Sequence, residues 1–285
     1  MAKLNFGGHT YLVVTKALDW FSAEANAEAK GGHLVKIDSA RENSAVFNFL
    51  MKESASWSKH YIAPDGGGAE YVWIGASDFA EEGQWHWADG SSLKYSKWGR
   101  AEPDDYQDQD GAAIGLEAWP KSKGNLGQAG EWNDVDVTNG LFSLIEYDGI
   151  AGGSGTDKII GTTKADTLMG LGGNDILTGG KGKDAFVFNT KLSRKSNLDK
   201  VTDFNVKDDT IRLDDAVFKS LAPGKLSVDS FHTGSGAHDA DDRIIYDSKK
   251  GALFYDADGD GAEAQIQFAT LSKNLKMTGA DFLVI

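Results

Sequence analysis

The sequence predicts an α+β domain followed by an all-β segment in which short parallel strands wind into a coil. Residues 1–149 are rich in tryptophan and combine two helical stretches with short runs of β-forming residues. Residues 152–186 repeat one nine-residue unit four times without a break, which is difficult to obtain by chance. The remaining residues follow this repeat with no linker and continue as short alternating runs typical of strands.

The composition excludes several classes of protein. With 285 residues, 40% of them apolar, the chain is large enough for two domains that each bury a core. Its net charge of −14 argues against nucleic acid or an anionic membrane as a partner. Because there is no cysteine, disulfides, thiol catalysis and cysteine-type zinc sites are excluded. No stretch approaches the length of a membrane span, and residues 1–8 lack the apolar region of a secretory signal peptide.

Two helices are predicted in the first domain. The first covers residues 18–29, which are rich in alanine and glutamate, and Gly31-Gly32 ends it. Trp20 and Phe21 are expected to form its apolar side. The second runs from Ser39, a residue type that caps helix starts, to Lys52. Its buried face is expected to contain four apolar residues, namely Val46, Phe47, Phe49 and Leu50.

Two apolar runs, residues 72–75 and 141–147, are predicted strands of this domain. Between them, residues 99–111 are rich in proline, glycine and aspartate. That segment is too polar for a core, so we interpret it as a long functional loop.

Residues 1–149 also contain a series of short motifs. They are, in sequence order, Gly31-Gly32-His33-Leu34-Val35, Glu42-Asn43, Trp73-Ile74-Gly75, Gly83-Gln84-Trp85 with Trp87 and Asp89-Gly90, Trp98, Glu102-Pro103-Asp104, and Trp132-Asn133-Asp134. In this order they resemble the C-type lectin-like domain. The resemblance implies a lectin-like fold with two helices, mixed antiparallel sheets and long loops. The chain lacks the disulfide pairs of that family, so packing and metal ions are expected to hold the domain together.

The polar loop and the last of these motifs supply a predicted calcium site. In the lectin-like family, the proline between Glu102 and Asp104 follows a cis peptide, which turns both side chains to one side. The resemblance adds Asp110 from the same loop, and Asn133 and Asp134 from the neighbouring strand. Five oxygen-bearing side chains suit the coordination number of calcium and leave positions for sugar hydroxyls, so the same five are the predicted sugar-binding residues. The alternative is a solvated acidic loop in an acidic protein.

The resemblance also implies a second calcium site in this domain. Asp78, Glu82 and Asp105 stand at matching positions, and Asp110 is available to both sites. Gly111 stands where the family often has another acidic residue. The alternative is that these are ordinary solvated surface acids.

Each nine-residue repeat has an aspartate at its sixth position and a large apolar residue at its eighth. Glycines let the backbone point its carbonyls inward, and the apolar residue suits a three-residue strand. If two units make one turn of a coil, Asp157 lies one turn from Asp175, and Asp166 lies one turn from Asp184. Carboxylates and carbonyls at such positions would bind a hard cation, which favours calcium over zinc. The alternative is a flexible linker, but a linker needs no apolar residue in register.

These repeats resemble the RTX nonapeptide, which implies a calcium-binding parallel β-roll over residues 150–190. Its predicted calcium ligands are glycines and aspartates of the repeats, namely Gly155, Asp157, Asp166, Gly173, Asp175, Gly182 and Asp184. The second unit departs from the family pattern, because Lys164 stands where a glycine is expected. That unit is expected to bind calcium more weakly, although Asp166 is retained.

Residues 191–285 resemble the C-terminal region that follows the roll in serralysin-type proteins. The resemblance rests on three segments, Asp203-Phe204, residues 243–247 and residues 254–259. The last five residues, Asp281 to Ile285, resemble an uncleaved signal for type I secretion. This resemblance implies the type I secretion machinery as a partner and an extracellular location without a cleaved N-terminal signal peptide.

Residues 256–261 also invite comparison with an EF-hand loop. However, Gln267 stands where such a loop needs a bidentate glutamate. Repeated Asp-Gly pairs between two apolar runs are more simply a hairpin turn, which we favour.

No catalytic motif accompanies these modules. None of the six histidines belongs to a His-Glu-x-x-His zinc motif, and Gly153-Ser154-Gly155 belongs to the repeat and not to a nucleophile elbow. We therefore expect a protein that is not an enzyme. The favoured hypothesis is a secreted lectin that binds a carbohydrate or glycoconjugate through calcium in its loops. The alternative is an adhesion module for proteins or surfaces, in which calcium only shapes the loops.

Overall fold

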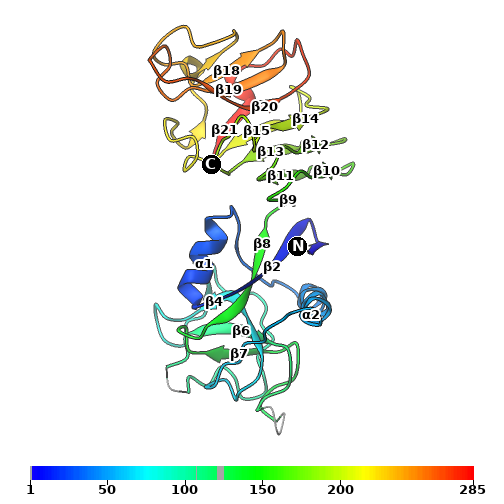
Figure 1. The fold of residues 1–285 in the computed structure, drawn as a ribbon. Helices are drawn as coiled ribbons and strands as arrows, with labels where there is room; N and C mark the ends of the chain where they lie inside the picture. Colours follow the sequence, from blue (N-terminus) through cyan, green and yellow to red (C-terminus); the bar gives the residue numbers. More distant parts are fainter. Residues whose placement is uncertain (1, 107, 121–124) are drawn as a thin grey trace. The chain divides into compact units, whose positions relative to one another are not determined.

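The computed structural model describes residues 2–106, 108–120 and 125–285. The described residues divide into two compact units, Met1–Asp148 and Gly149–Ile285 (Figure 1). Within this part of the chain, no helix combines the length and apolar character needed to cross a bilayer.

The first unit is built around one mixed sheet with the strand order β1-β2-β8-β4-β6-β7, to which β3 is added at β8 and β5 at β4. These strands are β1 (Lys3–Phe6), β2 (His9–Leu18), β3 (His33–Leu34), β4 (Tyr71–Ser77), β5 (His86–Trp87), β6 (Gly111–Gly115), β7 (Trp132–Val135) and β8 (Leu141–Tyr147). β4 runs parallel to β8, whereas β2 and β6 run antiparallel to their neighbours. The two strands predicted from the sequence, β4 and β8, lie next to each other in the middle of the sheet.

Helix α1 (Trp20–Glu28) begins after Asp19, whose side chain caps the first turn. Trp20 is buried as expected, but the expectation that Phe21 shares this buried side is wrong. The Phe21 ring is 47% exposed and lies edge to face against Phe79, with the ring centroids 5.0 Å apart. Successive residues are about 100° apart around a helix, so two neighbours cannot both point into a narrow core face.

Helix α2 (Ala40–Ser54) begins after Ser39, which confirms the predicted start. Val46, Phe49 and Leu50 are buried as predicted, whereas Phe47 is half-buried. The helix is therefore oriented by three of its four predicted apolar residues.

Asn43 on α2 is buried and connects the helix to the strand that carries part of the predicted calcium site. Its side chain accepts a hydrogen bond from the indole N–H of Trp132 at 2.7 Å and donates one to the carbonyl of Gly130 at 2.9 Å. Trp132 and Gly130 are both buried, and these hydrogen bonds satisfy their polar groups within the domain. This contact fixes β7 against α2 without a disulfide.

In the second unit, all of whose residues are described, the strands form two sheets. One has the order β10-β12-β14-β20-β19-β18-β17, and the other has the order β16-β21-β15-β13-β11-β9. The strands of the repeats alternate between the two sheets along the sequence; these strands are β9 (Ile150–Gly153), β10 (Lys158–Ile160), β11 (Thr167–Leu171), β12 (Ile176–Thr178) and β13 (Ala185–Phe188). β14 (Asp199–Val201) and β15 (Thr210–Leu213) continue the alternation.

The predicted coil of two repeats per turn is present in the strand register. Ile159 in β10 lies opposite Leu177 in β12, and Leu168 in β11 lies opposite Phe186 in β13, all in parallel pairs. All four apolar residues are buried in one core. Each repeat therefore buries its apolar residue only because a neighbouring turn covers it.

Beyond the repeats, the chain adds antiparallel strands to one sheet and returns to the other sheet at its end. The antiparallel strands are β18 (Ile244–Asp247), β19 (Ala252–Tyr255) and β20 (Ile266–Thr270), and shorter elements are β16 (Gly224–Lys225), η1 (Val228–Ser230), β17 (Phe231–His232) and η2 (Gly279–Asp281). Residues 256–261 lie in the connection between β19 and β20, as the hairpin interpretation expects. β21 (Phe282–Val284) pairs in parallel with β15, and Phe282 and Val284 are each only 2% exposed.

Candidate functional site

The loop before β6 and the strand β7 bring three carboxylates together. Glu102, Asp104 and Asp134 each offer one oxygen, and these oxygens lie within 4.8 Å of one another. The Glu102–Pro103 peptide bond is cis. Three of the five side chains predicted for the first calcium site therefore form one group.

Asp134 is the buried member of this group, with 0% of its surface exposed. Its Oδ2 accepts a hydrogen bond from the backbone N–H of Asp105 at 2.8 Å, whereas its Oδ1 has no hydrogen-bond partner among the described residues. Burial raises the pKa of Asp134 to about 7, and the charges of Glu102 and Asp104 contribute in the same direction. A buried carboxylate oxygen without a donor is costly unless a cation balances it, so the group fits calcium.

Hydrogen bonds from the protein fix the positions of the other two carboxylates. The indole N–H of buried Trp119 donates to Oε1 of Glu102 at 2.8 Å. The backbone N–H of Tyr106 donates to Oδ1 of Asp104 at 3.1 Å. Burial raises the pKa of Glu102, and the nearby charge of Asp104 adds to this effect. Repulsion among these acids is the electrostatic condition that a divalent cation relieves.

Asn133, the fourth predicted residue, is buried beside the group and is held by a tyrosine. Its amide nitrogen donates to the hydroxyl of Tyr71 at 3.0 Å, and that hydroxyl donates to the carbonyl of Gly66 at 2.7 Å. One amide hydrogen of Asn133 is thus used inside the protein. Its part in binding calcium or sugar stays a proposal.

Asp110, the fifth predicted residue, lies with residues predicted for the second site. Its carboxylate forms a group with Asp78 and Glu82, with oxygens within 4.8 Å of one another. Asp78 is 3% exposed; its Oδ2 accepts from the N–H of Gly83 at 3.0 Å, and its Oδ1 has no hydrogen-bond partner in the described part of the chain. Burial raises the pKa of Asp78 to about 7, with Glu82 and Asp110 adding to it. This group therefore shows the same fit to a cation as the first.

Asp105, also predicted for the second site, groups with Glu82 and with Asp108. Both loop aspartates have positive φ, 50° for Asp105 and 71° for Asp108. Asp108 is not among the residues predicted from the sequence, and its only signal is its place in the acidic loop. Because Glu82 belongs to both groups, the structure joins the predicted residues of the second site through this one side chain.

In the roll, aspartates of successive turns are linked through the backbone. Oδ1 of Asp175 accepts a hydrogen bond from the N–H of Asp157 at 2.7 Å. Oδ1 of Asp184 accepts one from the N–H of Asp166 at 3.0 Å. The four predicted aspartates thus stand as two stacked pairs, in the arrangement that the repeat spacing predicts.

The same ladder continues into aspartates that the repeat pattern does not reveal. Oδ1 of Asp199 accepts from the N–H of Asp175, and Oδ1 of Asp209 accepts from the N–H of Asp184, both at 3.0 Å. Burial raises the pKa of Asp199 to about 7, with the charge of Asp175 contributing. The separations are 24 and 25 residues instead of 18, so these aspartates fall outside the nine-residue register.

The glycines predicted as backbone ligands lie where one turn of the roll meets the next. Gly173 and Gly182 have φ values of 133° and 139°. A Cβ on Gly173 would lie 2.4 Å from the carbonyl oxygen of Gly155, and one on Gly182 would lie 2.3 Å from that of Lys164. Only glycine leaves room for these oxygens. Lys164 therefore presents its carbonyl where Gly155 does one unit earlier, and the departure from the repeat does not remove this oxygen.

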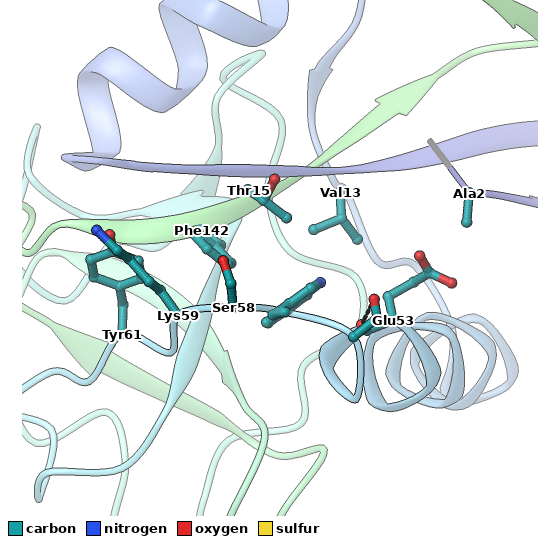
Figure 2. Close-up of a pocket in the computed structure, with 10 residues that line it drawn as sticks. Ala2, Val13, Thr15, Glu53, Ser58, Lys59, Tyr61 and Phe142 are labelled. Atoms are coloured by element: carbon teal, nitrogen blue, oxygen red, sulfur yellow. Dashed lines mark hydrogen bonds between the residues drawn. The ribbon is translucent and has the colours of Figure 1, made fainter.

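Two pockets of the first unit lie away from these acidic groups. One, of about 300 Å³, lies between β2 and the end of α2, where Tyr61 and Phe142 line it together with Lys59 and Ser58 (Figure 2). The other, of about 290 Å³, is lined by polar residues that include His9. None of the predicted calcium ligands lines either pocket.

Two family models match separate parts of the chain. Residues 16–139 match the model of the lectin C-type domain, and residues 151–185 match the model of the RTX calcium-binding nonapeptide repeat in four copies. Both families bind calcium ions, so calcium is the cofactor of both segments. Residues 191–285 lie outside the two matched ranges, and their resemblance to serralysin-type proteins stays a prediction.

Curated relatives match the first unit only over part of their own length. The galactose-specific lectin nattectin of Thalassophryne nattereri is 35% identical over 88 residues, which cover 31% of this chain and 48% of that protein. The alpha-N-acetylgalactosamine-specific lectin of Patiria pectinifera is 34% identical over 104 residues, which cover 36% of this chain and 51% of that protein. The chain thus spans about half the length of these two relatives. Among solved structures, the carbohydrate-recognition domain of the mouse scavenger receptor C-type lectin has a TM-score of 0.40 at 23% identity, covering 52% of this chain and 94% of that one.

Proposed function

We propose that this chain is a calcium-dependent carbohydrate-binding lectin without enzymatic activity, and that sugar binds on the calcium held by Glu102, Asp104 and Asp134. The observation that carries the proposal is the unpaired, buried Oδ1 of Asp134 beside two further carboxylates. A cation at this place satisfies that oxygen and relieves the repulsion of the three acids. The match of residues 16–139 to the lectin C-type domain supports the assignment of the cation as calcium.

In this proposal Asn133 extends the ligand set of the first calcium, whereas Asp110 binds the neighbouring calcium. Asn133 stands next to Asp134 on β7, and its amide oxygen is a suitable neutral calcium ligand. Asp110 binds the neighbouring calcium together with Asp78 and Glu82, and Asp105 joins this site through its group with Glu82. Two ions side by side would order the loop on both sides of the sugar.

Two vicinal hydroxyls of a sugar complete the coordination of the first ion and also hydrogen-bond to the side chains that hold it. Glu102 and Asp104 are acceptors only when ionised, so both accept hydrogen bonds from the sugar and neither donates one. Asn133 is the remaining amide, and one of its hydrogens is already bound to Tyr71. A site with so few donors distinguishes the orientation of hydroxyls poorly. We therefore infer weak and broad binding of monosaccharides.

The roll is assigned to export and to folding outside the cell. Its stacked aspartates repel one another without calcium, so the segment stays unfolded at low cytosolic calcium and remains suited to a type I exporter. Extracellular calcium sites bind with dissociation constants of about 0.1–1 mM, which is near the concentration outside the cell. The terminal segment from Asp281 to Ile285 serves as the secretion signal.

A second candidate function is an adhesion module that binds a protein or a surface and no sugar. It is favoured by the exposed pair Phe21 and Phe79, which are 47% and 53% exposed and in contact with each other. Phe79 directly follows Asp78, so calcium at the second group would fix the position of this aromatic pair. In that case calcium shapes the surface but does not touch the ligand.

A glycan array probed with the full chain in millimolar calcium and in chelator distinguishes the two functions. The lectin proposal expects binding to a broad set of terminal sugars in calcium and its loss in chelator. Substitution of Phe21 and Phe79 by serine is expected to leave sugar binding unchanged. An array without calcium-dependent binding to any glycan would reject the lectin function in favour of the adhesion module.

A further inference from the structure

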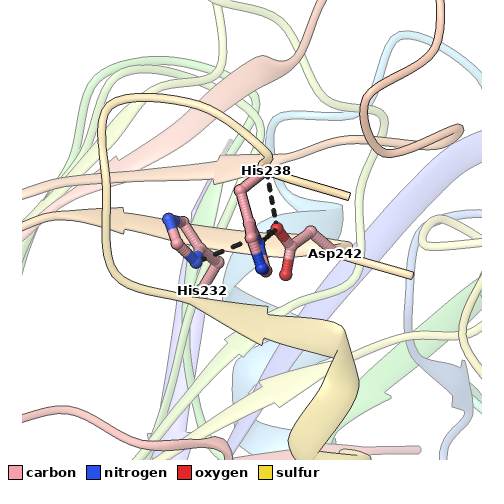
Figure 3. Close-up of side chains that lie close together, drawn as sticks. All are labelled: His232, His238 and Asp242. Carbon is pink, nitrogen blue, oxygen red and sulfur yellow. Dashed lines mark hydrogen bonds and ion pairs between the residues drawn. The ribbon is translucent and has the colours of Figure 1, made fainter. Parts of the chain in front are cut away.

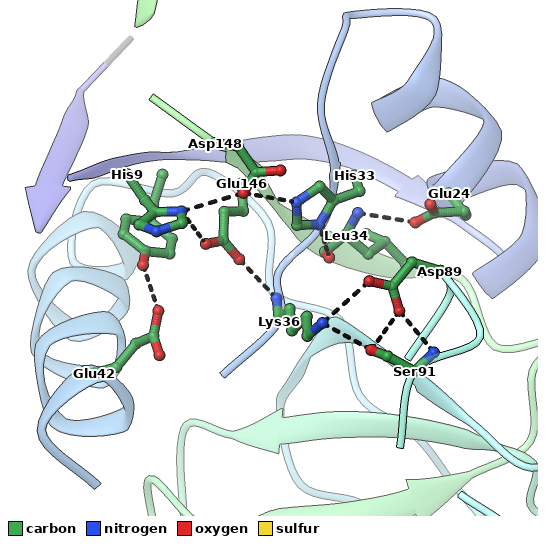
Figure 4. A network of polar contacts seen from close by, with 11 residues as sticks. His9, Glu24, His33, Leu34, Lys36, Glu42, Asp89, Ser91, Glu146 and Asp148 are labelled. Carbon is green, nitrogen blue, oxygen red and sulfur yellow. Dashed lines mark hydrogen bonds and ion pairs between the residues drawn. The ribbon is translucent and has the colours of Figure 1, made fainter. Parts of the chain in front are cut away.

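On the first unit, away from the acidic loop, His9, Glu146 and Asp148 offer donor atoms within 4.8 Å of one another, and His33 lies beside Asp148 (Figure 4). His9 begins β2, His33 begins β3, and Glu146 lies in β8. The register places His33 opposite Glu146, and Thr10 opposite Tyr147, so His9 and Asp148 follow one residue further along their strands. Strand pairing thus brings these four residues together, although their spacing in the sequence does not indicate a site.

The donor atoms of this set are separated by distances that suit a small tetrahedral ion. Nδ1 of His9 lies 2.8 Å from Oε1 of Glu146 and 3.3 Å from Oδ1 of Asp148. Nε2 of His33 lies 3.6 Å from the same oxygen of Asp148. Ligands about 2.0–2.1 Å from a tetrahedral ion are roughly 3.3 Å apart, which lies within the observed range. Three donors are therefore already close together, and a movement of His33 towards them would complete a tetrahedral set.

Hydrogen bonds to atoms outside this set orient His33 and Glu146, as is usual for metal ligands. Nδ1 of His33 lies 2.8 Å from the carbonyl of Leu34, so this nitrogen carries a hydrogen and Nε2 is the nitrogen directed towards Asp148, where a metal ion would replace its proton. Oε2 of Glu146 accepts from the backbone N–H of Lys36 at 2.8 Å, which leaves Oε1 towards His9. Glu146 is 3% exposed, so its position is fixed by packing as well.

We propose that His9, His33, Glu146 and Asp148 bind a zinc ion that cross-links β2, β3 and β8. Two imidazoles and two carboxylates suit zinc, whereas calcium prefers oxygen ligands alone. The pocket of about 290 Å³ that His9, His33, Glu146 and Asp148 line gives the ion access from solvent. In a chain without cysteine, this ion performs the cross-linking that a disulfide would otherwise provide.

Another group of histidines in the second unit lacks these features (Figure 3). The rings of His232 and His238 stack with centroids 4.5 Å apart and an angle of 20° between their planes, so their lone pairs do not converge on one point. Oδ2 of Asp242 already accepts from the backbone N–H of His238 at 2.7 Å and from the ring of the same residue. The donor atoms of this group nevertheless lie within 4.8 Å of one another, so this group is removed from the test below.

The test is a calorimetric titration of the full chain with zinc chloride in millimolar calcium, which keeps the calcium sites filled. Both His232 and His238 are replaced by Gln in all samples, so that only the proposed site remains rich in histidine. We expect one equivalent of zinc to bind, and His33→Gln or His9→Gln to weaken binding by about 100-fold or more, since even loss of an orienting partner costs about 10- to 100-fold. The matched control His60→Gln removes an exposed histidine whose ring faces Glu70, and it should bind as the parent does.

Two further measurements distinguish the loss of a specific metal site from the unfolding of a variant. Cobalt should give the intense visible absorption of a tetrahedral site in the parent and in His60→Gln, and not in His33→Gln. Zinc should raise the melting temperature of the first unit, followed by tryptophan fluorescence, in the same two proteins only. Absence of saturable zinc binding in the parent, or equal affinity in His33→Gln and the parent, would overturn the proposal.

Discussion

The backbone N–H of Asp157 donates to the Oδ1 of Asp175 at 2.7 Å, across 18 residues and one full turn of the roll. The same relation joins Asp166 to Asp184, so carboxylates of successive turns are stacked along the roll. Stacked carboxylates raise each other's energy unless a cation lies between them. Burial and the charges of neighbouring aspartates accordingly raise the pKa of Asp184. We therefore expect folding of the second unit to require calcium.

The first prediction is that calcium folds this unit. At a calcium concentration 100 times the dissociation constant, each site that binds only the folded state adds about 2.7 kcal/mol. Limited proteolysis of the full chain should therefore leave residues 149–285 intact in millimolar calcium and digest them in chelator. Asp175→Asn should require more calcium for protection, whereas Asp229→Asn, which changes an exposed acid outside the ladder, should not. Equal resistance in chelator and calcium would contradict the prediction.

The second prediction concerns competition between calcium and protons in the first unit. Burial raises the pKa of both Asp134 and Asp78 to about 7 in the calcium-free protein. Calcium binds the ionised forms, so its affinity should fall as the pH falls from 8 to 6, by up to about tenfold per pH unit for each proton displaced. All eight tryptophans lie in the first unit, so a calcium titration followed by tryptophan fluorescence reports this unit alone.

Without calcium, the stability of the first unit should change with pH in the opposite direction to the calcium affinity. A carboxyl group with a raised pKa stabilises the folded state below its unfolded pKa, and this contribution is lost as the pH rises through the folded value. The calcium-free first unit should therefore melt at a higher temperature at pH 5 than at pH 8, and the calcium-bound unit should not. A dissociation constant for calcium that is the same at pH 6 and pH 8 would refute the proton competition.

The third prediction is a change of sugar selectivity in Asp104→Asn. This change converts Glu-Pro-Asp into Glu-Pro-Asn and so places an amide in the loop. It restores an amide donor, and a hydrogen bond to a charged group is worth about 1.5–3 kcal/mol, so preference between epimers should rise about tenfold or more. Inhibition of binding by mannose and by galactose measures this ratio. An unchanged ratio in a variant that still binds calcium would mean that Asp104 does not touch the sugar.

The fourth prediction concerns export. Phe282 and Val284 belong to β21 and are buried in the roll, so removal of residues 281–285 affects folding as well as any signal. The control is Phe186→Ala, which removes a ring with 0% exposure from the core at a cost of about 3–5 kcal/mol and leaves the terminus unchanged. In a host competent for type I secretion, Phe186→Ala should reach the medium, and the truncated chain should remain inside. Normal export of the truncated chain would place the signal elsewhere.

Local patterns were sufficient for much of the fold. Ser39 marks the start of α2 because its hydroxyl can cap the first turn, and the nine-residue repeat places Leu168 and Phe186 in one core because spacing alone sets the coil. The exposure of Phe21 could not be predicted in this way, because the sequence of a short helix rich in alanine does not indicate which of two adjacent aromatic residues faces inward. Its contact partner Phe79 lies in a different element.

Sites assembled from distant segments could be predicted only where a motif marks them. Glu102, Asp104 and Asp134 were predicted from two motifs, and the structure brings them together. Asp199 and Asp209 continue the ladder of the roll, but the insertion after the repeats shifts them out of register. The group around Glu146 depends on the pairing of three strands, for which no local spacing exists.

The central claim is that sugar binds on the calcium held by Glu102, Asp104 and Asp134. Chelator alone tests it poorly, because chelator also removes calcium from the roll. The direct measurement is binding of intact protein and of Asp134→Asn to immobilised sugar in millimolar calcium, with protection of residues 149–285 from proteolysis checked in both. The account predicts that the intact protein is retained and Asp134→Asn is not, although the roll is equally protected. Equal retention of the two proteins would contradict it.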